Sequence, residues 1–146
     1  MILRTRSQQI QKQASLRRAI STAYYALFHL LIDEAVSNWA VERHRSILAR
    51  TFEHGKMRAI CGDVLKIAKS GGSVLPELHT VAGNFIQLQE QRYLADYDNS
   101  KDWSRADVLI VLKLATDAFT AWRAISTHDA AQDFLLQLFL PKLPKQ

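Results

Sequence analysis

Apolar residues recur every three or four positions along almost the whole chain, which is the spacing of one buried face of an α-helix. The pattern is clearest from Ser15 onward, where two such stripes run side by side. The first stripe comprises Leu16, Ile20, Ala23, Leu27 and Leu30, and the second comprises Tyr24, Phe28 and Ile32. Together they make the segment AYYALFHLLI apolar almost all round. We expect this helix at the centre of the fold, with neighbours on several sides.

The same periodicity predicts four further helical regions. One follows Val41 and is interrupted at EHGK, because Gly55 costs roughly 1 kcal/mol in a helix interior. The loop KSGGSVLPE precedes a third helix at about residues 76–97, and Ser104 with Asp107 resembles the capping box of a fourth. A short fifth helix ends at the C-terminal prolines. With no strand pattern anywhere, the sequence predicts an all-α protein, an antiparallel four- to five-helix bundle in one domain over residues 1–146.

Composition limits the compartments and chemistries open to such a chain. The longest apolar runs are far too short to span a bilayer, and MILRTRSQQIQKQ lacks the apolar segment of a signal peptide. The single cysteine, Cys61, allows no intrachain disulfide, which suits a reducing compartment. We therefore expect a cytoplasmic protein without a membrane segment.

Charge is distributed unevenly along the chain, whose net charge is +5. Residues 1–58 carry ten Lys and Arg against four Asp and Glu, and no acid precedes Asp33. A basic half of this kind attracts phosphate backbones through counterion release, so it favours nucleic acid as a partner. The cations that would form a phosphate-attracting face are Arg4, Arg6, Lys12, Arg17 and Arg18. The simpler alternative is a solvated helix face with chance asymmetry.

The five histidines do not predict a metal site, since no pair stands at the usual ligand spacings. No motif for a cofactor or a common enzyme class is present either. His29 lies within the most apolar segment and is expected to be a hydrogen-bonded core histidine. Arg50 and His54 would share a face if their helix is continuous. A surface pair is the simpler interpretation, although a histidine beside a cation can serve as a base.

The segment EQRYLADYDN, residues 90–99, offers the other candidate site. Arg92 supplies a fork of donors suited to phosphate, and Tyr97 supplies a ring that can stack on a base. Asp96, four residues after Arg92, can pair with it and hold it. The structural alternative is an ordinary helical ion pair, with Tyr97 covering the end of the core.

Two segments together resemble the HEPN superfamily. The first has a Ser-x-x-Tyr-Tyr-Ala-x-Phe pattern, formed here by Ser21, Tyr24, Tyr25, Ala26 and Phe28. The second has an arginine followed by Ala-Asp-Tyr, formed here by Arg92, Ala95, Asp96 and Tyr97. A histidine before a glycine, as in His54 and Gly55, is also common in that branch. Order and approximate spacing agree over about residues 15–100.

The resemblance implies a helical bundle, a homodimer, and association with RNA or nucleotides. Many HEPN proteins are metal-independent ribonucleases, and many are toxins neutralised by a nucleotidyltransferase partner. Their catalytic arginine and histidine are separated by four to six residues. Counting from Arg92, the histidine position holds Tyr97. A tyrosine hydroxyl is protonated at neutral pH and is a poor general base.

Three interpretations follow. The first is a HEPN-like protein that binds RNA, a nucleotide or a partner at Arg92, Asp96, Tyr97, Tyr24, Tyr25, Arg17 and Arg18, without standard ribonuclease chemistry and possessing no cofactor. The second is an active ribonuclease toxin in which His54 approaches Arg92 in space. The third is a structural partner of a nucleotidyltransferase. The aromatic content of the third and fourth helical regions, with Trp103 and Trp122, adds to the expectation of a homodimer.

Overall fold

The computed structural model describes residues 5–140, which form six helices and no strand. They are α1 (Arg6–Val36), α2 (Glu42–Ala49), α3 (His54–Lys69), α4 (Pro76–Tyr97), α5 (Arg105–Ile125) and α6 (Asp129–Phe139). The prediction of an all-helical bundle is confirmed. No helix within residues 5–140 combines the length and the apolar character that crossing a membrane requires.

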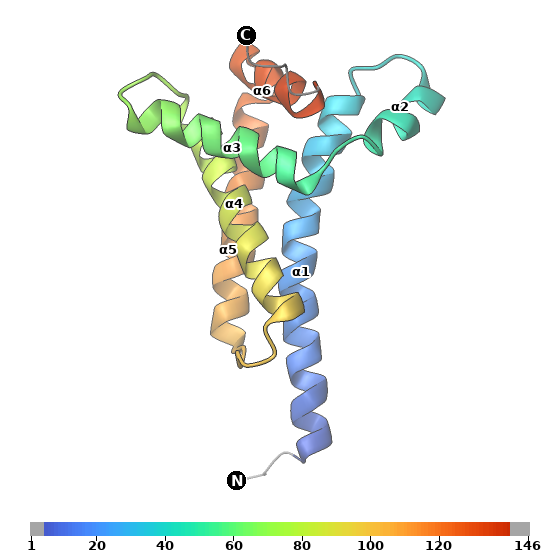
Figure 1. Ribbon diagram of the computed structural model, residues 1–146, viewed down its shortest axis with the longest axis vertical. Helices are drawn as coiled ribbons and strands as arrows, with labels where there is room; N and C mark the ends of the chain where they lie inside the picture. The colour runs from blue at the N-terminus through green and yellow to red at the C-terminus, as the bar shows by residue number, and fades with distance from the viewer. Residues whose placement is uncertain (1–4, 141–146) are drawn as a thin grey trace.

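The three longest helices, α1, α4 and α5, lie side by side and alternate in direction (Figure 1). α3 crosses one end of this group, and α6 covers the same end (Figure 1). α2 lies beside the C-terminal end of α1. This arrangement places the middle of α1, the start of α3 and the second half of α4 next to one another.

α1 begins at Arg6, nine residues before the apolar stripes indicated. Thr5 and Gln8 form a capping box there, each side chain bonding the other's backbone N–H. Residues 5–12 are exposed, and Figure 1 shows the first turns of α1 extending beyond the loop between α4 and α5. Apolar periodicity reports only helix that is packed against a core, so it missed this segment.

The second predicted helical region is two helices, broken at residues 50–53. The break therefore precedes Gly55, which lies in the first turn of α3. Arg50 is in the break and His54 is the first residue of α3, so their helix is not continuous and the two residues do not share one helix face. The separation leaves His54 free to turn toward α1 and α4.

The core is built from side chains of α1, α3, α4, α5 and α6. The largest fully buried ones include Trp122, Tyr24, Phe85, Leu27 and Met57. Trp103 and Trp122 both belong to this core. They already bury their surface within one chain, so the argument that these tryptophans call for a second copy is wrong.

Arg17 connects α1 to the end of α4 through hydrogen bonds. Its Nη1 donates to the carbonyl oxygens of Ala95 (2.8 Å) and Asp98 (2.9 Å), and its Nη2 donates to that of Lys101 (2.7 Å). The last carbonyls of a helix have no N–H donor within the helix, so a cation that donates to them stabilises the helix end. One turn earlier, the Gln13 side chain makes two 2.8 Å bonds with the backbone N–H and C=O of Trp103.

Candidate functional site

His54, Arg92 and two tyrosines meet where α1, α3 and α4 come together. The Arg92 guanidinium carbon lies 5.3 Å from the ring centre of Tyr24 and 5.7 Å from that of Tyr25. The His54 ring centre lies 5.6 Å and 5.8 Å from the same two rings. Residues of three helices that are 29 to 68 positions apart in the sequence thus share one cluster, which we call the His54–Arg92 cluster (Tyr24, Tyr25, His54 and Arg92).

A chain of hydrogen bonds runs beneath this cluster. Arg58 Nη1 donates to Gln89 Oε1 (3.1 Å), and Gln89 Nε2 donates to the Tyr24 hydroxyl oxygen (3.3 Å). The Tyr24 hydroxyl is 2.6 Å from Nδ1 of His54. Gln89 Nε2 also donates to the backbone oxygen of His54 (3.2 Å). Gln89 is a buried polar residue in the apolar face of α4, and sequence periodicity alone gave no reason to single it out.

The surroundings keep His54 neutral. Burial lowers the pKa of His54, and the nearby cation Arg92 and then His29 lower that pKa further. Burial raises the pKa of Tyr24 to about 12, although the hydrogen bond from Gln89 and the charge of Arg92 oppose the shift. At neutral pH, Tyr24 therefore holds its proton and His54 carries no charge. The His54 ring also stacks on Phe28, with ring centres 4.2 Å apart.

Arg92 is largely buried although it lies near the end of α4, with 14% of its side chain exposed. Its Nη1 lies 3.5 Å from Asp96 Oδ2, the ion pair that the four-residue spacing predicted. This distance is at the outer limit of a hydrogen bond. Arg92 Nε is buried and has no hydrogen-bond partner within residues 5–140. The pairing with Asp96 is therefore weak enough for a stronger acceptor to replace it.

Tyr97 does not cover the end of the core, so the structural alternative for this residue is wrong. It is 64% exposed, and Tyr93, one turn earlier, is 61% exposed. Their ring centres are 5.0 Å apart, so the two exposed rings pack against each other on one face of α4, each next in sequence to one member of the Arg92–Asp96 pair. Tyr93 was not predicted as a site residue, although its four-residue spacing from Tyr97 indicates that both lie on one face of the helix.

His29 is exposed, so the prediction of a core histidine is wrong. Its ring lies 6.1 Å from that of Tyr25 and is stacked with it. The segment AYYALFHLLI leaves one side uncovered, where Ala26 and His29 are exposed. Arg18 precedes Tyr25 by seven residues, so Arg18, Tyr25 and His29 follow one face of α1.

The basic residues of α1 divide into two groups. The Arg17 guanidinium donates to three backbone carbonyls, which leaves few of its N–H groups free to bind a phosphate. We therefore assign Arg17 a role in the fold and not in the candidate site. Arg18, Lys12 and Arg6 are exposed. Arg4 lies outside the described residues. The face that attracts phosphate is therefore smaller than the charge count indicated.

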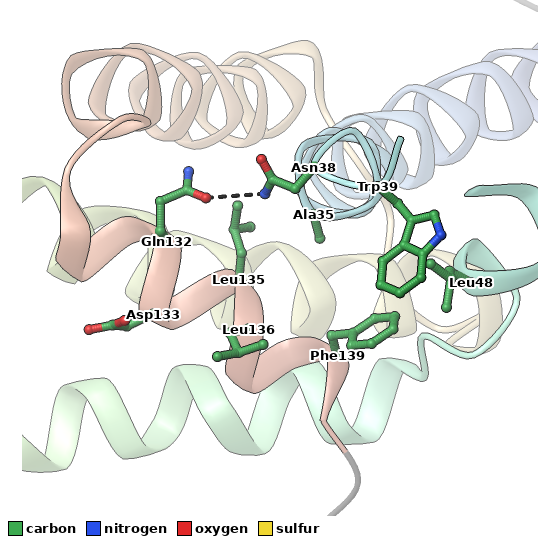
Figure 2. A pocket seen from close by; sticks show the side chains of 9 residues that line it. All are labelled: Ala35, Asn38, Trp39, Leu48, Gln132, Asp133, Leu135, Leu136 and Phe139. Atoms are coloured by element: carbon green, nitrogen blue, oxygen red, sulfur yellow. Dashed lines mark hydrogen bonds between the residues drawn. The ribbon is translucent and has the colours of Figure 1, made fainter. Parts of the chain in front are cut away.

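A separate groove of about 360 Å³ lies between the C-terminal end of α1, α2 and α6. Figure 2 shows the bond from Asn38 Nδ2 to Gln132 Oε1 (3.1 Å) at one side and the rings of Trp39 and Phe139 at the other. None of the site residues expected from the sequence lines this groove. Across residues 5–140, no three His, Cys, Asp or Glu side chains gather as metal ligands would.

Comparison of the chain with known protein families, curated proteins and solved structures found no significant match.

Proposed function

We propose that this chain is a HEPN-like protein that binds single-stranded RNA or a nucleotide at the surface around Arg92 and Tyr97, without ribonuclease chemistry. The observation that carries the proposal is the exposed Tyr93–Tyr97 pair beside a loosely paired arginine. Stacking on tyrosine contributes about 1–3 kcal/mol per base and accepts any base. An arginine next to such a platform supplies the contact to phosphate.

The neighbouring helices support the same proposal. Arg18, Tyr25 and His29 on α1 extend the surface with one cation and two further rings. Arg58 on α3 adds a second cation, although it pairs with Glu90 at 2.8 Å. An aromatic surface interleaved with cations is typical of proteins that bind single-stranded nucleic acid. A cytoplasmic location, a homodimer and a role in a toxin–antitoxin pair with a nucleotidyltransferase remain part of this proposal, on the strength of the resemblance.

We expect Arg92→Gln to weaken binding of a fluorescent single-stranded oligoribonucleotide at least tenfold, measured by anisotropy in the presence of a chelator. The change removes one cation, so the slope of log affinity against log salt should also fall by about 1. Arg123→Gln is the matched control, since it makes the same charge change at an exposed residue. Arg123 lies in the last turn of α5, and it is the start of α5 that follows the end of α4. Equal affinities for the wild type and Arg92→Gln would contradict the proposal.

A metal-independent ribonuclease is the second candidate, favoured by the approach of His54 and Arg92 to the same tyrosine rings. In that chemistry a histidine moves a proton at the ribose 2′-hydroxyl while an arginine steadies the phosphate. We expect no cleavage of single-stranded RNA by the wild-type protein in a chelator, as followed by gel electrophoresis. Tyr97→His, which restores the family spacing, should introduce slow cleavage. Rapid wild-type cleavage that both Arg92→Ala and His54→Ala abolish would favour this second candidate instead.

A further inference from the structure

The hydrogen-bond chain beneath the His54–Arg92 cluster has only one possible direction. A guanidinium group has donors and no acceptor, so the Gln89 atom that lies 3.1 Å from Arg58 must be the amide oxygen. The amide nitrogen then faces Tyr24 and the backbone oxygen of His54, at 3.3 Å and 3.2 Å. Arg58 thus fixes the orientation of the Gln89 side chain.

The direction continues through Tyr24. An amide nitrogen cannot accept a hydrogen bond, so the Tyr24 hydroxyl accepts from Gln89 and must give its own proton to another atom. His54 Nδ1 is 2.6 Å away and is the partner present. The raised pKa of Tyr24 means that the hydroxyl keeps this proton at all physiological pH values. His54 Nδ1 is therefore an acceptor.

We infer that the relay from Arg58 through Gln89 and Tyr24 holds neutral His54 in the tautomer with its hydrogen on Nε2, so that His54 offers a ligand a hydrogen-bond donor. Nε2 makes no hydrogen bond within the described part of the chain, and this atom is not buried. It is thus open to a ligand. Arg58, Gln89 and Tyr24 are positioning residues, because each acts through the next one.

This inference deepens the proposed function and rests on it for the identity of the ligand. A neutral imidazole that presents N–H can donate to a phosphate oxygen, but this nitrogen cannot take a proton from a ribose hydroxyl. The same relay that strengthens anion binding therefore withholds the base that ribonuclease chemistry needs. It gives a physical reason, besides the tyrosine at position 97, for binding without cleavage.

Long-range ¹H–¹⁵N correlation spectra of the ¹⁵N-histidine-labelled protein without RNA test the tautomer directly. We expect the Nε2–H pattern for His54 at neutral pH, assigned by its loss in His54→Gln. Tyr24→Phe removes the donor to Nδ1, so the signal should move toward a mixture of tautomers. An Nδ1–H pattern in the wild type, or a pattern that Tyr24→Phe leaves unchanged, would overturn the inference.

Gln89→Glu should reverse the relay at nearly constant shape. A carboxylate only accepts, so Tyr24 would donate to residue 89 and accept from His54, which places the hydrogen on Nδ1. Gln87→Glu is the matched control, since Gln87 is exposed on the same helix. We expect the tautomer to switch only in Gln89→Glu, together with at least fivefold weaker binding of the oligoribonucleotide. The expected tautomers in a protein that binds no RNA would support the relay and refute the proposed function.

Discussion

Replacing Arg17 by alanine should lower the free energy of unfolding by roughly 2–4 kcal/mol, because three backbone carbonyls lose a charged donor at once. These carbonyls belong to the end of α4 and to the loop that leads into α5, so the loss loosens the connection between two core helices. Equilibrium unfolding in urea, followed by far-UV circular dichroism, measures the change. Arg17→Lys should recover only part of it, since an ammonium cannot span three acceptors as a planar fork does.

The adjacent arginine provides the control for this measurement. Arg18 is exposed and forms no hydrogen bond or ion pair within residues 5–140, so Arg18→Ala should change the free energy of unfolding by less than about 0.5 kcal/mol. Both variants lose the same charge from the same helix, and a difference between them isolates the contacts of Arg17. If Arg17→Ala proved as stable as Arg18→Ala, these three contacts would contribute nothing measurable to the fold.

Labelling of the single cysteine should be slowed roughly a thousandfold in the native protein, relative to the unfolded chain, at pH 8. Cys61 is fully buried in α3, and burial raises the pKa of its thiol from 9.0 to about 12. A thiol reagent attacks the thiolate, whose population falls about tenfold for each unit of this shift. The reaction with a chromogenic disulfide, with and without denaturant, gives the two rates.

Because the chain has one cysteine, the signal comes from one position. The native rate also needs the side chain to reach solvent, so it reports opening of the core near α3 and can be slower still. A native rate within tenfold of the unfolded rate would mean that Cys61 is accessible and that α3 packs less closely than described. Arg17→Ala should accelerate labelling if its destabilisation extends to this part of the core.

Local signals in the sequence predicted the helices that are packed against the core. α4 occupies Pro76–Tyr97 as expected, and the capping box of Ser104 and Asp107 forms both of its hydrogen bonds. These features depend on residues that lie within one or two helical turns of each other. Such residues are close together in the sequence, so the sequence pattern can predict them. The exposed start of α1 was not predicted, because it leaves no apolar repeat. The interruption between α2 and α3 was expected at EHGK, but it lies at residues 50–53.

The candidate site could be predicted only in part, because its geometry depends on contacts between distant residues. The motif residues Arg92, Asp96 and Tyr97 were singled out, and the Arg92–Asp96 pair is present. The role of Arg17 in the fold was not predicted, since its three acceptors are 78 to 84 residues away. The burial of His29 was predicted wrongly. An apolar segment shows which residues can be buried, but it does not show how many other helices pack against them.

The hydrogen bonds between α1 and the loop after α4 have a consequence for synthesis on the ribosome. Gln13 binds the backbone of a residue that follows it by 90 positions. At about 5–20 residues per second, roughly 5–18 seconds pass between translation of the two partners. During that interval the apolar stripes of α1 have been made, but the helices that cover them are incomplete. The nascent chain therefore lacks part of the cover for its first helix until most of the domain has been made, and apolar surface of this kind is prone to aggregation.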